Sequence, residues 1–299
     1  MASKTRVKKL SAELYIGRAI ALLLLALLIC RAVAAYASSV RDGARLYVSV
    51  LDVGQSDAIL LRTGDAAMLI DTGTSACEED LRAALLYYKI DRLDYVVLTH
   101  PHEDHIGNTR LVLQMAEVSQ LVLPVADVDD PVYTLILSEA EQMGISTVAA
   151  ETGQRFLFGD AAVEVLLAAL PEDDNVNNSS TVLRVTYGTQ VLLFMGDAEA
   201  ELEHTLLEMY APEYLDCDFL KVGHHGSDTA TSAAFMAVAT PTVAAISAGK
   251  YNSYGFPHKA VLENLAAVGA NVFCTADHGT LTFATDGQEL RLVPANKGG

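Results

Sequence analysis

Residues 99–107 read Thr-His-Pro-His-Glu-Asp-His-Ile-Gly and directly follow the apolar end of residues 94–98. Three of the eight histidines of the chain and two carboxylates fall within residues 100–105. A short apolar run bounded by polar residues is typical of a buried strand, and Pro101 excludes a continuing helix. The sequence therefore predicts a group of imidazoles and carboxylates on a loop at the end of a strand.

This spacing favours a site for two metal ions. His100 and His102 lie two positions apart and can face one ion, whereas Asp104 and His105 turn toward a second. Neutral imidazole and carboxylate suit Zn²⁺ and are acceptable to Mn²⁺. The motif is not the helical H-E-x-x-H of zinc proteases. We expect two divalent metal ions, Zn²⁺ or Mn²⁺.

Four residues cannot complete two metal shells, so further ligands must come from other strand ends. Asp197 ends an apolar run in Gly-Asp, where a carboxylate can bridge two ions, although this position taken alone favours an ordinary Asx turn after a strand. His224 and His225 follow the predicted strand of residues 218–223, and His258 follows a proline.

Strands and helices alternate along the chain, which favours two mixed sheets with helices outside, in one domain over residues 45–296. Apolar runs bounded by Gly and Asx turns predict strands, and 3.6-residue periodicity predicts helices. The main predicted strands are 45–53, 58–63, 66–73, 94–100 and 120–124, followed by four strands within residues 155–197 and by 218–223 and 242–249. The predicted helices are 77–90, 130–144, 198–210 and 257–269.

The N-terminal segment, residues 1–37, has the pattern of a targeting sequence. Its basic start is followed by twelve uninterrupted apolar residues, 19–30, and by Ala-Tyr-Ala at 35–37. This fits a signal peptide, and without cleavage the segment would be an N-terminal membrane anchor. Both alternatives predict a protein that is extracellular or anchored to the outer face of the cytoplasmic membrane.

The chain is acidic, with a formal net charge of −18 and four widely spaced cysteines that form no C-x-x-C motif. An acidic surface repels polyanions, so nucleic acid would have to be held at a local site through metal ions. No protein partner is evident from the sequence, and no G-x-S-x-G or P-loop motif supports a triad hydrolase or an NTPase.

Several segments together resemble the metallo-β-lactamase fold superfamily and, more narrowly, the C-terminal hydrolase domain of the ComEC/Rec2 competence proteins and their stand-alone relatives. In order, they read LDVGQSDAILL, MLIDTG, LTHPHEDHIGN, NNSSTVLRVTYG, VLLFMGD, LKVGHHGS and SAGKYNSYGFPH. The resemblance covers residues 47–258 and implies an α+β fold, a four-layer αββα sandwich with the site at one edge.

The resemblance also implies roles for individual residues. One metal ion would be held by His100 and His102, the other by Asp104 and His105, and Asp197 would bridge them. A histidine of the HHGS segment, His225 with His224 as the alternative, would complete a shell. Asp71 would support a ligand histidine from behind.

Two segments depart from the superfamily pattern. Many members carry a further histidine where this chain has Asn177, Asn178 and Ser180, as ComEC-like members do. Relatives also read Tyr-Gly-His-Pro where this chain has Phe256, which cannot ligate a metal ion. His258, two residues later, either replaces that imidazole or faces solvent.

The expected reaction is hydrolysis of a phosphodiester, most specifically DNA, by metal-activated water. Asp104 and Asp197 would position the water, and His225 or its neighbour would protonate the leaving oxygen. The alternative substrates are another extracellular phosphodiester, from a cell-wall polymer or a nucleotide. The alternative to an enzyme is a binding module whose metal site has decayed.

Overall fold

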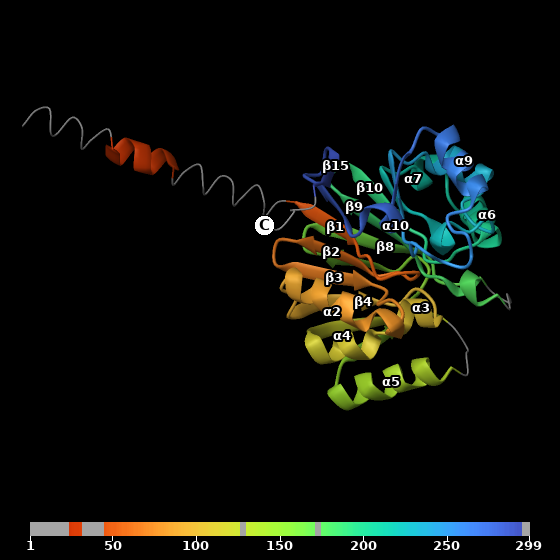
Figure 1. The fold of residues 1–299 in the computed structure, drawn as a ribbon, viewed down its shortest axis with the longest axis horizontal. Helices are drawn as coiled ribbons and strands as arrows, with labels where there is room; N and C mark the ends of the chain where they lie inside the picture. Colours follow the sequence, from red (N-terminus) through yellow and green to blue (C-terminus); the bar gives the residue numbers. More distant parts are fainter. Residues whose placement is uncertain (1–23, 32–44, 126–129, 171–174, 295–299) are drawn as a thin grey trace, which may run out of the picture. The chain divides into compact units, whose positions relative to one another are not determined.

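The computed structural model describes residues 24–31, 45–125, 130–170 and 175–294 (Figure 1). Contacts divide the chain into two compact units, residues 1–44 and 45–299. The described part of the first unit is a helix over residues 24–31 with exposed side chains, and the rest of the predicted segment 1–37 lies outside the described residues. Among the described helices, none has the length and apolar character needed to cross a membrane.

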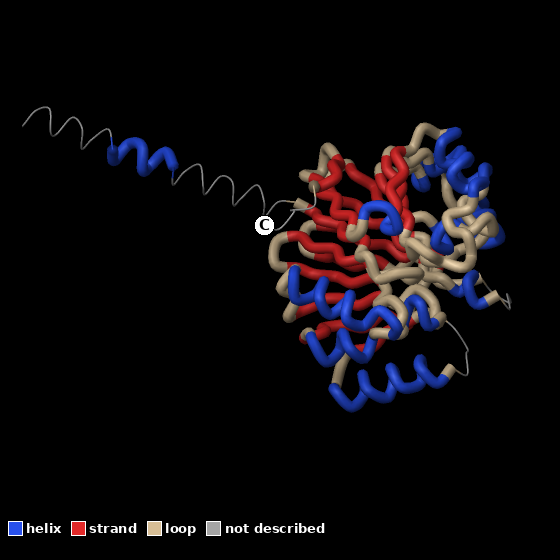
Figure 2. Tube along the Cα trace, in the orientation of Figure 1, coloured by secondary structure: helices blue, strands red, loops and turns tan. Residues whose placement is uncertain are grey.

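The second unit contains two mixed sheets (Figure 2). The first has the strand order β15-β14-β1-β2-β3-β4-β5-β6. Its strands from β3 to β6 run parallel, and the others pair antiparallel. In chain order they are β1 (Leu46–Val50), β2 (Ile59–Thr63), β3 (Ala66–Ile70), β4 (Arg92–Val97), β5 (Glu117–Leu123), β6 (Ser146–Ala149), β14 (Leu281–Thr285) and β15 (Leu290–Val293).

The second sheet has the order β13-β12-β11-β10-β9-β8-β7. It is parallel from β10 to β13 and antiparallel from β7 to β10. Its strands are β7 (Arg155–Phe158), β8 (Ala161–Leu167), β9 (Val182–Tyr187), β10 (Gln190–Phe194), β11 (Phe219–Lys221), β12 (Val243–Ile246) and β13 (Asn271–Cys274).

Helices cover the outer face of each sheet. On the first sheet, α2 (Glu78–Tyr87), α4 (Thr109–Met115) and α5 (Pro131–Met143) enclose one apolar cluster. On the second, α6 (Ala200–Met209), α8 (Ala233–Ala239) and α9 (Lys259–Ala267) enclose another, beside the short α7 (Pro212–Leu215). A third cluster, with Phe194 and Phe219 of one sheet and Phe283 of the other, fills the space between the sheets. The predicted αββα sandwich is confirmed.

Local signals explain why the predicted helices end where they do. In α5, the carboxylate of Asp130 accepts a hydrogen bond from the Tyr133 amide and Pro131 takes the first helical position. Gly144 closes the helix with φ 68°, a left-handed conformation that glycine adopts without a Cβ clash. The helix predicted for residues 130–144 is therefore confirmed almost residue for residue.

Candidate metal centre

Loops at the ends of strands from both sheets meet at one edge of the sandwich. The carboxyl ends of the parallel strands β3 and β4 meet there, as do those of β10 and β11. Backbone hydrogen bonds join these loops. The Asp57 amide donates to the Asp104 carbonyl at 3.1 Å, and the Thr181 amide donates to the Thr99 carbonyl at 2.9 Å. Residues far apart in sequence are thereby fixed around one point.

The histidine-rich loop is anchored on both sides. His100 is fully buried just after β4, and His102 is the extended residue that precedes α3 (Glu103–Ile106). The Glu103 carboxylate accepts hydrogen bonds from the Thr74 hydroxyl (2.6 Å) and the Ser75 amide (2.8 Å). His100 Nε2 and His102 Nδ1 lie 3.0 Å apart. The two histidines that the sequence predicts as ligands of one metal ion therefore have ring nitrogens that lie close together.

Asp71 lies behind His105. Its side chain is fully buried, and Oδ2 accepts a hydrogen bond from His105 Nδ1 at 2.8 Å. Both carboxylate oxygens also accept hydrogen bonds from Thr99, from the amide and from the hydroxyl, each at 2.7 Å. With Nδ1 engaged, the free Nε2 of His105 points to Asp197, whose Oδ1 is 3.2 Å away. Asp71 thus sets the orientation and the tautomer of His105.

Asp197 lies at the centre of the group, close to imidazoles from two motifs. Its carboxylate oxygens lie 3.8 Å from Nε2 of His100, 3.7 Å from Nε2 of His225 and 3.8 Å from Nε2 of His224. The Ser180 hydroxyl accepts a hydrogen bond from the Asp197 amide at 2.9 Å and lies 3.4 Å from His100 Nδ1. Ser180, in the segment where many superfamily members have a histidine, therefore supports the site from behind.

His224 and His225 occupy left-handed backbone conformations in η3 (Gly223–Gly226), with φ values of 47° and 53°. Non-glycine residues pay roughly 1–3 kcal/mol for such conformations, which cluster at functional sites. The His224 amide donates to the Gly196 carbonyl at 3.0 Å, which ties this turn to the loop of Asp197. The strained turn aims Nε2 of His225 at Asp104, 3.4 Å away, while His224 Nδ1 lies 3.1 Å from a Glu199 oxygen at the rim.

Asp57 and Lys221 form a buried ion pair beneath His225, which the sequence reasoning missed. Their side chains are almost fully buried with Nζ and Oδ2 2.8 Å apart, and Asp57 Oδ1 lies 3.4 Å from His225 Nδ1. The available signal was an isolated Lys inside the apolar run of residues 219–222 and an isolated Asp before the apolar residues 58–61. Charged residues in such runs are buried only when they are paired.

The cluster sets the protonation of its own members. Burial opposes charge at Asp197, but His105 and His225 outweigh it and hold the pKa of Asp197 well below its usual range. Burial also works against protonated His105 and His225, yet the Asp197 carboxylate raises both pKa values. Asp71 adds to this effect at His105, and Asp57 adds to it at His225, whose pKa rises to about 9. Burial and the neighbouring His105 lower the pKa of His100 well below its usual value.

The polar atoms of this cluster that are buried without a hydrogen-bond partner include Nε2 of His105, Oδ1 of Asp197 and Nε2 of His225. Buried polar atoms are normally satisfied, so a converging unsatisfied set indicates a missing ligand. Groups of three residues whose ligand atoms all lie within 4.8 Å of one another include His100, His105 and Asp197, and also Asp104, His105 and His225. Imidazole and carboxylate donors in this arrangement fit divalent metal ions.

Three predicted ligands lie outside these groups of three: His102, His224 and His258. His102 and His224 still lie close to His100 and Asp197, respectively, whereas both ring nitrogens of His258 face other partners. His258 Nδ1 lies 3.0 Å from an Asp228 oxygen, and its Nε2 lies 3.1 Å from the Tyr254 carbonyl. Phe256 instead lies next to the site, with its ring 5.8 Å from that of His224. The Phe256 ring is also stacked on Tyr254, which is 65% exposed, at 5.3 Å. A half-buried Phe256 covered by the exposed ring of Tyr254 therefore stands where relatives carry a histidine.

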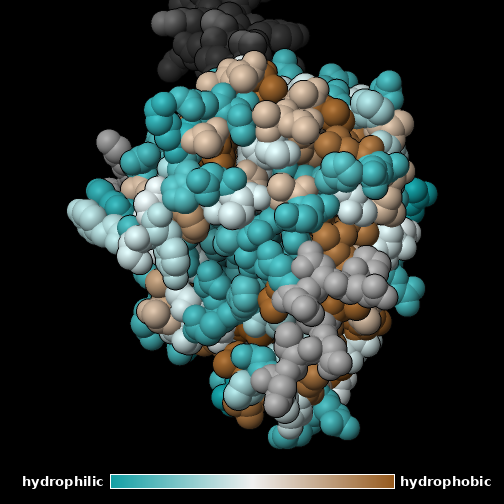
Figure 3. All heavy atoms as spheres, turned by 90° about the vertical axis from the view of Figure 1, so that its right-hand side faces the viewer, coloured by the Kyte–Doolittle hydropathy of each residue, from teal (hydrophilic) through white to brown (hydrophobic). Residues whose placement is uncertain are grey.

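Figure 3 shows the right-hand side of the molecule as seen in Figure 1, the side toward which α3 lies. A hydrophilic band, hollowed along part of its length, crosses this face between more apolar patches. Several of the acidic and imidazole side chains remain partly accessible, since Asp104 is 36% exposed and His224 is 21% exposed. The cluster can therefore be reached from solvent.

The chain belongs to the metallo-beta-lactamase superfamily, whose family model matches residues 51–250. Divalent metal binding, typically of two ions, is a property of proteins with this fold, and the His/Asp cluster has the donors for it. The predicted superfamily membership is thus confirmed.

Within the superfamily the chain is similar to competence proteins. It is 32% identical over 254 residues to ComE operon protein 3 of Bacillus subtilis and 30% identical over 237 residues to competence protein ComA of Neisseria gonorrhoeae. Each alignment covers 79% of this chain and 32% of the relative. The chain therefore spans about a third of the length of these relatives.

Solved structures with the same fold are more distant in sequence. The metallo-beta-lactamase fold protein YhfI of Bacillus subtilis has a TM-score of 0.54 at 14% identity, with 81% of this chain and 99% of that chain covered. The diiron β-hydroxylase CmlA of Streptomyces venezuelae has a TM-score of 0.51 at 16% identity, covering 76% and 52%. At these identities the likeness shows the fold alone.

Proposed function

We propose that this protein is a metal-dependent phosphodiesterase that hydrolyses DNA. The observation that carries the proposal is the set of unsatisfied, buried ligand atoms on His105, Asp197 and His225 at the sheet edge. Superfamily membership supports metal-dependent hydrolysis, and the similarity to competence proteins supports DNA as the substrate.

Two divalent ions, Zn²⁺ or Mn²⁺, would share this cluster. One would be held by His100 and His102, whose ring nitrogens are 3.0 Å apart. The other would be held by Asp104, His105 and His225, which form one group of potential ligands. Asp197 has an oxygen toward each set and would bridge them. His258 is left out of this assignment, because both of its ring nitrogens face other partners.

When bound, such ions would supply Lewis acidity toward a phosphoryl oxygen and would lower the pKa of water toward about 7. The carboxylates of Asp104 and Asp197 would accept hydrogen bonds from the attacking water and fix its direction. His224 is partly exposed at the rim and lies close to Glu199, so it is the histidine of the pair placed to donate a proton to the leaving oxygen. His225 is buried among the proposed ligands and would remain unprotonated.

The aromatic pair of Tyr254 and Phe256 supports a nucleic-acid substrate. Tyr254 is the exposed ring of the pair, and Phe256 holds it in place from below. An exposed ring beside a hydrolytic site can stack on a base, which contributes roughly 1–3 kcal/mol per base in single-strand binding. The net charge of −18 disfavours long electrostatic tracks along a duplex. We therefore infer that single-stranded DNA is the preferred form.

We further propose that the protein acts outside the cytoplasm, either secreted or anchored to the outer face of the cytoplasmic membrane. The support is the basic start, the twelve-residue apolar run and the Ala-Tyr-Ala site within residues 1–37. Fractionation of cells that express the tagged chain tests this, and recovery of all material in the cytoplasm contradicts it.

The first experiment measures hydrolysis of bis(p-nitrophenyl) phosphate by the full chain with added Mn²⁺ or Zn²⁺. We expect metal-dependent turnover that is lost in His102→Ala/Asp104→Ala. The matched control is His204→Ala/Asp65→Asn, which changes the same residue types at exposed positions. End-labelled single-stranded and duplex DNA then test the substrate.

The alternatives give different results. Turnover of the small diester without cleavage of either DNA would favour another phosphodiester, from a cell-wall polymer or a nucleotide. No turnover with either ion, together with binding of fewer than two ions, would favour a decayed site. Phe256 and His258 are the residues that would account for that outcome, and Phe256→His would be the first variant to make.

A further inference from the structure

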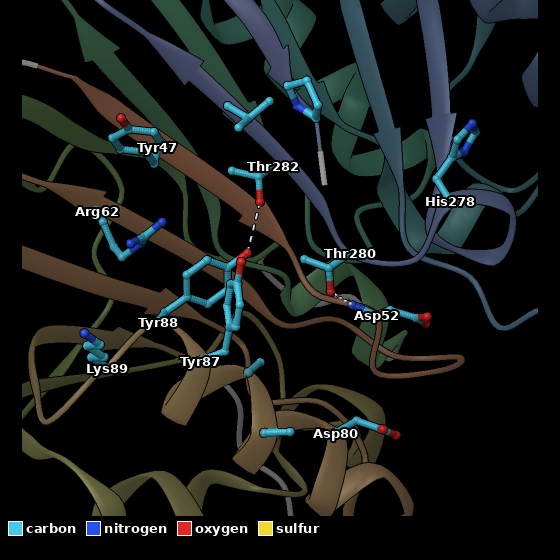
Figure 4. Close-up of a pocket in the computed structure, with 14 residues that line it drawn as sticks. Tyr47, Asp52, Arg62, Asp80, Tyr87, Tyr88, Lys89, His278, Thr280 and Thr282 are labelled. Atoms are coloured by element: carbon cyan, nitrogen blue, oxygen red, sulfur yellow. Dashed lines mark hydrogen bonds between the residues drawn. The ribbon is translucent and has the colours of Figure 1, made fainter. Parts of the chain in front are cut away.

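A second pocket lies outside the metal centre, on the outer face of the first sheet between α2 and β14 (Figure 4). Its volume is about 740 Å³, which falls within the range of small-molecule sites. Tyr47 of β1 and Arg62 of β2 form a cross-strand pair in its floor, and Tyr87 and Tyr88 come from the end of α2. None of these residues has a part in the proposed hydrolysis.

Arg62 is the unusual member of this pocket, because its contacts are with aromatic rings rather than carboxylates. Its guanidinium lies 4.4 Å from the centre of the Tyr88 ring and 5.4 Å from that of Tyr47. Its Nε is buried and has no hydrogen-bond partner. Among the described residues, no carboxylate forms an ion pair with Arg62. In a chain with 38 acidic and 20 basic residues, an Arg held in this way has the properties of an anion site.

The charges of the pocket are separated along its length. Figure 4 shows Tyr47, Arg62 and Lys89 toward one end and Asp52 and His278 toward the other. The Tyr87 ring is 68% exposed and meets Tyr88 edge-on at 4.9 Å, so one large ring face is free. The pocket therefore offers a cation at one end, an exposed ring, and a carboxylate acceptor at the other end.

We propose that this pocket binds a mononucleotide. The phosphate would lie on the Arg62 guanidinium with Lys89 nearby, and the base would stack on Tyr87. Asp52 would accept a hydrogen bond from an exocyclic amino group of the base. Asp52 and Asp80 would repel the phosphates of a longer strand, so the pocket favours a single nucleotide over an oligonucleotide.

The pocket is connected to the metal centre through one short loop. Residues 51–58 run from Asp52, which lines the pocket, to Asp57, which lies beneath His225. The choice of a nucleotide as ligand rests on the proposed function, since hydrolysis of DNA to completion would release mononucleotides. The anion site at Arg62 does not depend on that function.

The test is calorimetric titration of the full chain with 2′-deoxyadenosine 5′-monophosphate in the presence of EDTA, so that bound metal ions make no contribution. We expect binding in the millimolar range or tighter. Arg62→Gln should weaken it about tenfold or more, since hydrogen bonds to charged groups contribute roughly 1.5–3 kcal/mol. Tyr87→Ala should weaken it about fivefold or more through lost stacking.

Matched controls separate the pocket from general effects. Leu86→Ala changes an exposed residue of the same helix that does not line the pocket, and Arg92→Gln removes an exposed Arg elsewhere on the sheet. Neither should change the affinity. If Arg62→Gln does not fold, Tyr87→Ala and Lys89→Gln, at exposed positions, carry the test.

The proposal would be overturned by no binding of the nucleotide, by equal binding by the variants and the parent chain, or by equal binding of deoxyadenosine, which lacks the phosphate. Inorganic phosphate binding as tightly as the nucleotide would also contradict it and leave only a small-anion site. Failure of the proposed hydrolysis is seen separately, as absence of metal-dependent turnover by the unmodified chain. The His102→Ala/Asp104→Ala variant should bind the nucleotide unchanged, because neither residue lines the pocket.

Discussion

Asp71 contacts His105 and Thr99 but lies behind the ligand set rather than within it. Its two oxygens receive hydrogen bonds from His105 Nδ1, the Thr99 amide and the Thr99 hydroxyl. Burial raises the pKa of Asp71, and the hydrogen bonds from His105 and Thr99 oppose this rise because they stabilise the carboxylate. The orientation of His105 therefore depends on the hydrogen bond that its Nδ1 donates to Asp71, on the side of the ring away from Asp197.

Asp71→Asn should weaken metal binding about 10- to 100-fold, because loss of an outer hydrogen bond to a ligand histidine typically has this effect. The measurement is competition of the purified chain with a chromogenic zinc chelator. Asp65→Asn, in the exposed turn between β2 and β3, is the control. An unchanged affinity in the Asp71 variant would contradict the role assigned to it.

The pH dependence of stability follows from His105 and His225. Their pKa values are raised in the folded, metal-free chain, that of His225 to about 9. A raised pKa contributes stability that is complete below the unfolded value of about 6.5 and is lost as the pH rises through the folded value. The urea midpoint of the EDTA-treated chain should therefore fall between pH 6.5 and 9. A midpoint that rises over this range would contradict the charge state of the cluster.

Some residues of the cluster could be predicted from the sequence, and others could not. A cluster of imidazoles and carboxylates could be predicted because His100, His102, Asp104 and His105 are concentrated in one segment. Asp57 and Lys221 could not be paired in the same way, because they are 164 positions apart and meet only when the two sheets pack. The position of His258 after a proline also did not indicate its contacts. In the folded chain its Nδ1 lies beside Asp228 and its Nε2 lies beside the Tyr254 carbonyl.

At the scale of elements, strands and helices with a clear pattern were predictable, while their ends were less so. The strand predicted for residues 45–53 ends at Val50, because residues 51–58 turn away to bring Asp57 to the site. No helix was predicted for α8, since Ala-Ala-Phe-Met-Ala-Val-Ala is apolar on all sides and has no 3.6-residue pattern. Its signal is the Ser232 side chain, which accepts a hydrogen bond from the Phe235 amide.

The ion pair of Asp57 and Lys221 joins the loop before β2 to the end of β11. Lys221→Met would leave the Asp57 carboxylate buried without its partner, at a cost of about 3–5 kcal/mol. Urea unfolding of the metal-loaded chain measures this loss. The double variant Asp57→Asn/Lys221→Met, which removes both charges, should recover much of the stability. Equal loss in the single and double variants would show that shape rather than charge holds these elements together.

At the scale of the whole molecule, the net charge of −18 determines how the proposed DNA hydrolysis should respond to salt. When a protein binds DNA through 6–10 phosphate contacts, its affinity falls by a factor of roughly 10³–10⁵ between 50 and 200 mM salt. An acidic chain that holds its substrate mainly through bound metal ions and stacking releases few counterions. We expect kcat/KM for single-stranded DNA to change less than about tenfold over this range. A steep fall would reveal a basic track for the strand.

The two sheets each contribute part of the metal centre, and this has a consequence for when the protein becomes active. Asp71 and the histidine-rich loop belong to the first half of the chain, whereas Asp197 and His225 follow strands of the second. The earlier segment holds several of the proposed ligands but not the bridging carboxylate. A nascent chain that ends before Asp197 therefore lacks the carboxylate that would bridge the two ions of the proposed centre. The proposed hydrolysis would become possible only when synthesis has passed residue 225 and the second sheet has packed against the first.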